Sequence, residues 1–262
     1  MAEYLIQDTT LTGIADAIRE KTGGTDPVAV SDMAAQIEGI QAGGGDIDAL
    51  IDGSLAEISS NVKTVLGHKF RESKLKTANF PAATSIGTYA FADCSYLETV
   101  NFPVAKSVGA SAFRESSRLE TVNFPVATSV GANAFQICSR LKTANFPMAT
   151  SIEGQTFRSC SNLETAEFSV ATSIGTYAFS SCSKLVTVIL RSETMAALSN
   201  ANAFSATPIA SGTGYIYVPS ALIEQYKVAT NWSTYATQFR ALEDYTVDGT
   251  VTGELDPAKT GT

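Results

Sequence analysis

Hydrophobic and polar positions recur along this chain with a period of 22 residues, from Leu75 to about Leu190. Each unit begins with a leucine, and a fixed period of roughly 20 to 50 residues is typical of a solenoid built from stacked units. The leucines that open the units are Leu75, Leu97, Leu119, Leu141, Leu163 and Leu185. Positions within a unit are counted from this leucine, taken as position 0.

Within each unit, apolar residues at positions 3 and 5 alternate with polar residues at positions 2 and 4. An alternation of period two predicts a short β-strand with one buried face. The proline usual at position 6 ends this strand, because proline cannot donate a hydrogen bond to a neighbouring strand. Positions 10 to 12 (Ser-Ile/Val-Gly) predict a second extended piece and a turn, and positions 15 to 19 (Ala-Phe-x-x-Cys) predict a single helical turn. Stacked units then form a parallel sheet on one side, with a phenylalanine-rich core behind it.

Positions 2 and 4 point outward if positions 3 and 5 point into the core. Position 2 is threonine in every unit, and position 4 is asparagine until Glu167 and Ile189 interrupt the column. One interpretation is structural, because threonine favours strands and stacked amides bond along a column. The other is functional, since a rigid polar plane with a spacing of about 5 Å can bind a carbohydrate or a partner protein. The candidate partner-binding residues are Thr99, Asn101, Thr121, Asn123, Thr143, Asn145, Thr165, Glu167 and Ile189.

The four cysteines all occupy position 19, and Ser116 takes that place in the second unit. A residue that recurs at one position of a solenoid forms an inward column, where a free cysteine behaves as a small buried apolar side chain. Stacking at about 5 Å would allow a disulfide between Cys138 and Cys160 or between Cys160 and Cys182. A disulfide is not expected in a reducing cytoplasm. A metal site would need a second type of ligand, and the single histidine, His68, lies outside the column.

The flanking segments contain helical spacings and linker composition. Ser31 can cap a helix that runs through Ile40, the segment QAGGG from Gln41 indicates a linker, and residues 46–58 and 195–202 have helix-like patterns. The predicted division is a helical assembly unit over 1–40, a linker and N-terminal cap helix over 41–64, the solenoid over 65–205, a C-terminal cap over 206–245 and a mobile tail over 246–262.

The segments Leu-x-Thr-Val/Ala-Asn-Phe-Pro, Thr-Ser-Ile/Val-Gly and Ala-Phe-x-x-Cys-Ser resemble the BspA-type leucine-rich repeat family over roughly residues 65–205. This resemblance implies an α/β solenoid with short parallel β-strands on one face and helical N- and C-terminal caps. Glu153 is the one internal departure, because the other units have glycine there, and it predicts that the turn shifts by one residue.

The N-terminal run from Leu11 to Arg19, followed by Thr25-Asp26-Pro27, resembles segments of tail-associated proteins from phages and prophages of Gram-positive gut bacteria. The resemblance implies that residues 1–40 bind other tail proteins. Two short helices bury little apolar surface alone, so this unit is expected to pack on a partner or in a homo-oligomer.

Charge and missing motifs exclude several functions. The net charge of −8 argues against nucleic acid and against an anionic membrane surface as partners, because both attract clustered Lys and Arg. The N-terminus lacks a basic segment followed by an apolar run, so no secretory signal is expected, and no apolar stretch approaches the ~20 residues of a membrane span. A single histidine leaves Ser-His-Asp, Cys-His and histidine-based metal sites without their parts.

These observations predict a non-enzymatic binding or structural module without a cofactor. We expect a phage or prophage tail protein in the virion that displays the solenoid toward a protein or glycan of the host surface. The alternative is an adhesin of the same repeat family on the bacterial cell surface. The interruption of the asparagine column at Glu167 and Ile189 is where we expect a specific site, because variation from a regular column can encode specificity.

Overall fold

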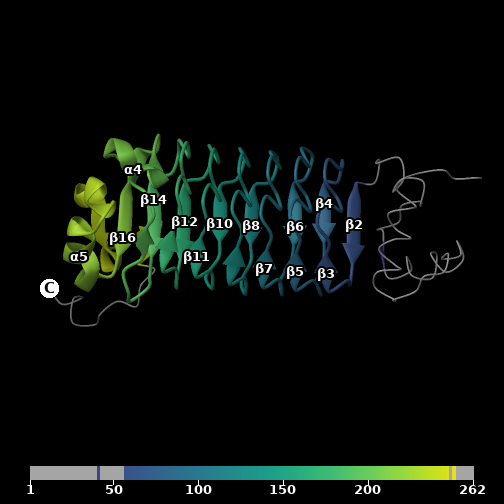
Figure 1. The fold of residues 1–262 in the computed structure, drawn as a ribbon, viewed down its shortest axis with the longest axis horizontal. Coiled ribbons are helices and arrows are strands. Elements are labelled where there is room, and N and C mark those ends of the chain that lie inside the picture. The colour runs from purple at the N-terminus through teal and green to yellow at the C-terminus, as the bar shows by residue number, and fades with distance from the viewer. Residues whose placement is uncertain (1–39, 42–55, 248–249, 252–262) are drawn as a thin grey trace, which may run out of the picture.

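The structure is a computed structural model that describes residues 40–41, 56–247 and 250–251. Within this part, the chain winds as a solenoid whose units stack along the long axis of the molecule (Figure 1). The expectation of an α/β solenoid with short parallel strands on one face is confirmed.

The strands at positions 2 to 5 form the larger face of the solenoid, and they pair in parallel with threonine beside threonine. They fall into two hydrogen-bonded groups, which meet between β6 and β8. The first group contains β1 (Ile40–Gln41), β2 (Glu57–Ser60), β4 (Thr77–Asn79) and β6 (Thr99–Asn101). The second is β8 (Thr121–Asn123), β10 (Thr143–Asn145), β12 (Thr165–Phe168), β14 (Thr187–Leu190), β16 (Tyr215–Val218) and β17 (Phe239–Ala241).

Shorter strands at positions 10 and 11 form a second ladder, as the Ser-Ile/Val pattern predicts. It comprises β3 (Thr64–Val65), β5 (Ser85–Ile86), β7 (Ser107–Val108) and β9 (Ser129–Val130), then β11 (Ser151–Ile152), β13 (Ser173–Ile174) and β15 (Ala197–Leu198). The ladder is divided between β9 and β11, beside Glu153.

The division at Glu153 has a steric cause. Its counterpart Gly175 lies so close to the preceding unit that an added Cβ would be 2.5 Å from the Gly154 nitrogen. A side chain at Glu153 therefore keeps β11 away from β9. The predicted shift of the turn by one residue is wrong, because Asn133 N still donates to Gly154 O at 3.1 Å, in the register of the other units.

Positions 15 to 19 form successive tight turns, so the predicted helical turn is wrong. The residues at positions 14 and 18 have positive φ, as at Tyr89 (55°) and Asp93 (61°). These left-handed residues rotate the backbone, so that its amides point along the solenoid axis and not along a helix. Phe91 N, for example, donates to Ala112 O of the next unit at 2.7 Å.

The N-terminal end of the sheet differs from the predicted boundaries. Strand β2 lies within the segment 41–64, and Ile58 pairs with Ala78, so the parallel part of the sheet begins at Glu57 and not at residue 65. The helix predicted over 46–58 is therefore wrong at Glu57 and Ile58, because burial of Ile58 in the core outweighs the helical spacing. Strand β1 (Ile40–Gln41) pairs antiparallel with β2, where a helix end and a linker were predicted. The rest of the predictions for 1–55 lies outside the described residues.

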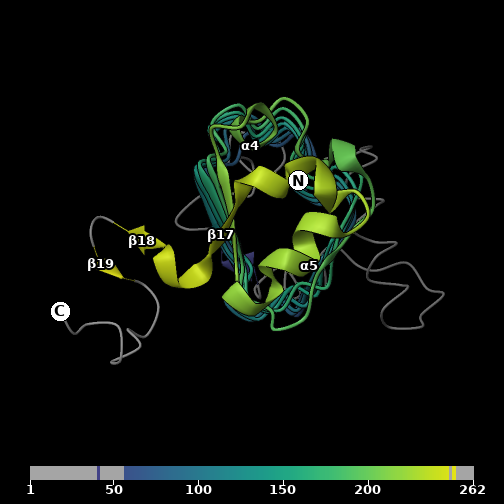
Figure 2. The ribbon, with the colours of Figure 1, turned by 90° about the vertical axis from the view of Figure 1, so that its left-hand side faces the viewer.

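The C-terminal end is covered by short helices (Figure 2). Residues 195–202, predicted as a helix, instead contain β15 and the start of η1 (Ala201–Phe204), because Leu198 continues the ladder of short strands. The cap contains α4 (Pro208–Ser211), η2 (Ser220–Leu222), α5 (Ile223–Val228), η3 (Trp232–Gln238) and η4 (Leu242–Asp244). Beyond it, β18 (Thr246–Val247) pairs with β19 (Thr250–Val251), and the remaining predicted tail lies outside the described residues.

Polar tips of the cap's side chains bind the last turn of the solenoid. Trp232 Nε1 donates to Ala196 O and Asn231 Nδ2 donates to Leu198 O, both at 2.7 Å. The hydroxyl of Tyr226 accepts from Ala196 N at 2.8 Å. The aromatic bodies cover the apolar end while their polar groups satisfy backbone groups that have no further strand to pair with.

The core contains two columns of stacked phenylalanine rings, at positions 5 and 16. Phe91 and Phe113 stack with ring centroids 5.2 Å apart, and Phe124 and Phe146 stack at 5.3 Å. The four cysteines are free and buried beside these rings.

Candidate partner-binding face

The outward side chains of positions 2 and 4 form a surface that we name the strand face. In each strand the residue at position 3 points into the core, so the hydroxyl at position 2 and the amide at position 4 share one side of the sheet. Six of the nine candidate residues are exposed on this face: Thr99, Asn101, Thr121, Asn123, Thr143 and Asn145. The structure therefore brings the middle of the predicted site together as one plane.

The asparagines of the strand face are hydrogen-bonded along the solenoid axis. Asn101 Nδ2 donates to Asn79 Oδ1 at 2.7 Å, and Asn79 Nδ2 donates to Ser59 Oγ at 2.9 Å. Further along, Asn145 Nδ2 donates to Asn123 Oδ1 at 2.9 Å. These bonds orient each amide and leave it a second N–H and a second lone pair for an external partner.

The amide column is interrupted between β6 and β8, at a place we name the seam. Among the described residues, no hydrogen bond joins Asn101 to Asn123, and the two strands belong to different hydrogen-bonded groups. The rings of Phe102 and Phe124 behind the seam are 6.0 Å apart, compared with 5.2 Å for Phe80 and Phe102. The Oδ1 of Asn101 and the Nδ2 of Asn123 therefore have no hydrogen-bond partner within the part of the chain that the structure describes.

Across β4, β6, β8 and β10 positions 2 and 4 carry no charged side chain, and charged residues lie next to the ends of these strands. Arg118 pairs with Glu98 at 3.5 Å, and Lys142 pairs with Glu120 at 2.9 Å. The hydrogen bond from Lys142, together with its charge, lowers the pKa of the Glu120 carboxyl. Glu98 and Glu120 occupy the same position on either side of the seam, and like charges opposite each other disfavour pairing of the strands.

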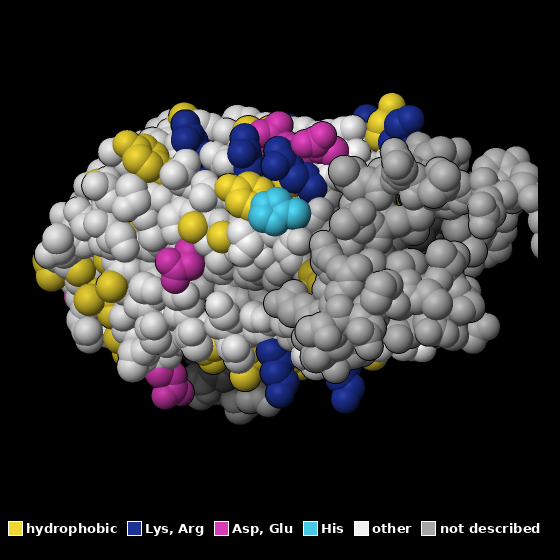
Figure 3. Space-filling model, turned by 45° about the vertical axis from the view of Figure 1, so that its right-hand side comes forward, with side chains coloured by type: hydrophobic (Ala, Val, Ile, Leu, Met, Phe, Trp, Pro, Cys, Tyr) yellow, Lys and Arg dark blue, Asp and Glu magenta, His cyan; other side chains and the backbone are white. Residues whose placement is uncertain are grey.

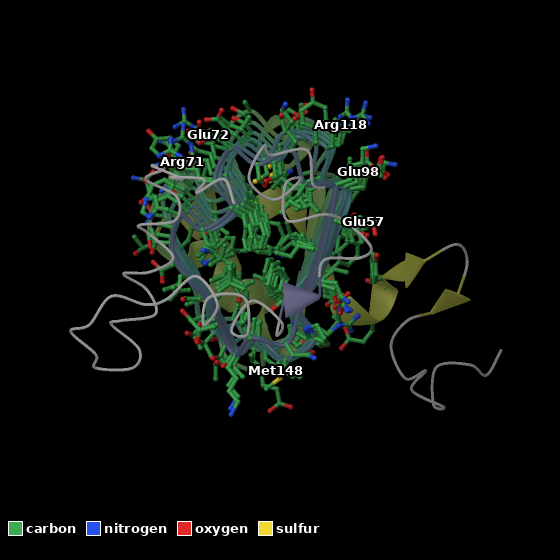
Figure 4. The ribbon with its side chains drawn as sticks, turned by 90° about the vertical axis from the view of Figure 1, so that its right-hand side faces the viewer. Glu57, Arg71, Glu72, Glu98, Arg118 and Met148 are labelled. Atoms are coloured by element: carbon green, nitrogen blue, oxygen red, sulfur yellow. The ribbon has the colours of Figure 1, made fainter. Side chains whose placement is uncertain are left out.

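An apolar ridge lies on the side of the coil that the chain enters after each of these strands, where Figure 4 labels Met148. It consists of the exposed position-7 side chains Val104, Val126, Met148 and Val170. The prediction of site residues missed this ridge. The available signal was an apolar side chain directly after the proline that ends each strand. This position lies outside the alternating pattern whose apolar residues point into the core.

The last units differ in exposure from the middle of the strand face. Ile189 is 0 % exposed, so it cannot bind a partner, and Thr165 and Glu167 are half-buried. Glu167 accepts a hydrogen bond from Arg191 Nε. After β17 the chain turns onto the outer side of the sheet (Figure 2), where the ring of Tyr245 lies 4.9 Å from that of Tyr217, the strand neighbour of Ile189. The C-terminal segment therefore contacts the strand next to Ile189.

The turns across the coil from the strand face carry a mixed group of charges, in which the histidine is prominent (Figure 3). His68 stacks on Tyr89 at 5.1 Å, and Arg71 lies 3.2 Å from Asp93. Within the described residues, no three His, Cys, Asp or Glu side chains are grouped as metal ligands. None of the helices described is long and apolar enough to cross a membrane.

Stacked strands, tight turns and two phenylalanine columns define a leucine-rich-repeat solenoid with an exposed polar face. The chain belongs to the family described as BspA type leucine rich repeat region, whose model matches six copies over residues 54–142 and 106–215. No curated protein matches the chain, and the comparisons indicate no catalytic family.

Several solved structures are similar to the chain. A leucine rich cell surface protein from Faecalibacterium prausnitzii is 27 % identical over 52 % of this chain and 44 % of its own, with a TM-score of 0.41. A leucine-rich repeat protein from Bacteroides ovatus is 18 % identical over 69 % of this chain and 66 % of its own, with a TM-score of 0.40. The chain therefore spans less than half the length of the F. prausnitzii protein.

Proposed function

We propose that this protein is a non-enzymatic binding module whose strand face recognises a protein or glycan on a cell surface. The observation that carries the proposal is the exposed plane of Thr99, Asn101, Thr121, Asn123, Thr143 and Asn145. Exposed amides and hydroxyls held in register by a packed core form a pre-organised surface, which reduces the entropy lost on binding.

For the location of this module we propose a phage or prophage tail, on the resemblance of its N-terminal run to tail-associated proteins. A bacterial cell surface is the second candidate, because the same repeat family includes adhesins. Mass spectrometry of purified virions and of cell-envelope fractions separates the two. Detection only in the envelope would rule out the tail.

The binding proposal is tested by placing bulky charges on the strand face. We expect Asn123→Arg combined with Asn145→Arg to fold normally and to lose binding of the full chain to intact Gram-positive gut bacteria. The matched control is Ser129→Arg, an exposed residue of β9 on the other ladder, which should bind as the unchanged protein does. If the strand-face variant binds cells equally well, the face is structural only.

A further inference from the structure

We propose that the strand face binds an uncharged, extended polysaccharide that lies along the solenoid axis, with one sugar ring per unit and a sugar hydroxyl inserted at the seam between Asn101 and Asn123. The inference rests on the proposed function and specifies its ligand. Charge, spacing, hydrogen bonding and the apolar ridge each support it.

The strand face is an uncharged area on a protein with a net charge of −8. The stretches from position 2 to position 8 of four consecutive units contain no Asp, Glu, Lys or Arg: residues 77–83, 99–105, 121–127 and 143–149. Of the charges beside this area, Glu98 pairs with Arg118 and Glu120 pairs with Lys142. A charged polymer would find no counter-charge on this surface, whereas a neutral one needs none.

The spacing of the face suits a polymer. Thr121 pairs with Thr143 and Asn123 pairs with Asn145, so identical groups repeat at the distance between strands, about 4.8 Å. An extended chain of β-linked pyranose rings advances by nearly this interval per ring. Each ring can then lie over one threonine hydroxyl and one asparagine amide. Successive rings of a β-1,4-linked chain are turned over relative to one another, so identical contacts recur at every second unit and not at each one.

The open groups at the seam select a hydroxyl. Asn123 Nδ2 offers a donor and Asn101 Oδ1 offers an acceptor, on either side of one gap. A hydroxyl both accepts and donates, so a single hydroxyl can complete the amide column. A carboxylate cannot donate to Asn101, and an ammonium group cannot accept from Asn123. The seam therefore favours a sugar hydroxyl over a charged group of a glycan or protein.

The apolar ridge provides a place for the non-polar part of a sugar. Val126 and Met148 are 40 % and 46 % exposed and follow Asn123 and Asn145 by three residues in their units. Pyranose rings carry C–H groups as well as hydroxyls, and burying these against aliphatic side chains adds to affinity. A polar plane bordered by an apolar ridge matches this two-sided character.

The test measures binding of the full chain to soluble, uncharged β-1,4-linked glucan, xylan and mannan by affinity electrophoresis, with polygalacturonate as the charged comparison. We expect at least one neutral polymer to retard the protein and polygalacturonate to have no effect. Oligosaccharides of that polymer, measured by titration calorimetry, should bind more tightly with length until the chain spans the exposed strands. Retardation by none of the neutral polymers, or by polygalacturonate alone, overturns the inference.

Two matched variants test the seam directly. Asn101→Asp and Asn123→Asp add the same charge on either side of the gap. Asn101→Asp removes the donor to Asn79 but keeps the acceptor at the gap, whereas Asn123→Asp keeps the acceptor for Asn145 and removes the donor at the gap. Asn123→Asp should weaken binding about tenfold, the loss expected for one hydrogen bond to a desolvated group, while Asn101→Asp retains most of the affinity. Equal losses would contradict the placement of the hydroxyl. The variant that combines Asn123→Arg with Asn145→Arg separates this inference from the proposed function. If that variant loses cell binding, but neutral polysaccharides do not compete with cells for the unchanged protein, the glycan inference fails while the binding function stands.

Discussion

The thiol of Cys138 donates a hydrogen bond to the backbone carbonyl of Phe113, one unit earlier, at 3.1 Å. Cys160 and Cys182 make the same contact with Phe135 and Phe157. Where serine replaces cysteine, Ser116 Oγ donates to Phe91 O at 3.0 Å. Position 19 therefore holds a small buried donor, and the sequence-based description of these cysteines as apolar side chains was incomplete.

The donor role predicts the effects of substitutions at Cys160. Cys160→Ala leaves the Phe135 carbonyl buried without this partner and should lower the free energy of unfolding by about 1–3 kcal/mol. Cys160→Ser keeps a donor and should cost less. Urea denaturation followed by circular dichroism measures both variants. Equal losses in the two would mean that the hydrogen bond contributes nothing and that only volume matters.

The buried thiols also predict how stability depends on pH. Burial raises the pKa of Cys138 and Cys160 above the ordinary thiol value of 9.0. Above pH 9.0 the unfolded thiols ionise and the folded ones do not, so the unfolded state binds fewer protons and stability falls as pH rises. Once its unfolded form is ionised, each such thiol lowers the free energy of unfolding by roughly 1.4 kcal/mol per pH unit.

Thermal unfolding measured from pH 7 upward tests this effect. We expect the unfolding temperature to fall between roughly pH 9 and pH 10. Burial also raises the pKa of Tyr226 and Tyr235 above 10.0, so these residues add to the loss only at higher pH. Combining Cys138→Ser with Cys160→Ser removes two thiols and should flatten the decline. An unchanged slope in that variant would show that the thiols are not its source.

Close packing of units predicts opposite outcomes for two neighbouring glycines. A Cβ at Gly175 would lie 2.5 Å from Gly154 N, whereas at Gly154 the nearest atom is Thr176 O at 3.4 Å. Gly175→Ala should therefore destabilise the protein by roughly 1–3 kcal/mol, as overpacking does. Gly154→Ala should be neutral or slightly stabilising, because it restricts the unfolded chain. Chemical denaturation of both variants is the check, and similar midpoints would contradict the steric account.

The phenylalanine columns predict a large loss on truncation. Phe124 is fully buried and stacks on Phe146 at 5.3 Å. Phe124→Ala should cost about 3–5 kcal/mol, because the neighbouring units cannot collapse into the cavity. Phe124→Leu fills most of that volume and serves as the milder control. A loss below 1 kcal/mol for the alanine variant would place this ring outside a close-packed core.

Much of the solenoid could be predicted from the repeat itself. Because each position recurs in the same environment, the inward Leu, Val, Phe and Cys columns and the outward Thr and Asn columns followed from periodicity alone. The helical turn predicted for positions 15 to 19 was wrong, because left-handed residues such as Tyr89 and Asp93 leave no clear mark in a sequence. The outward position predicted for Asn123 and its neighbours agrees with the structure, and their role in binding stays a prediction.

The sequence by itself determined which side chains face the core and which face outward, since alternation and period are local properties of the chain. Only the tertiary structure decided which outward positions stay exposed and how neighbouring units meet. Ile189 is outward in its strand and yet buried, and its strand neighbour Tyr217 contacts Tyr245, more than 50 residues later in the chain than Ile189. The seam between Asn101 and Asn123 likewise depends on how two whole units approach each other, which neither unit encodes alone.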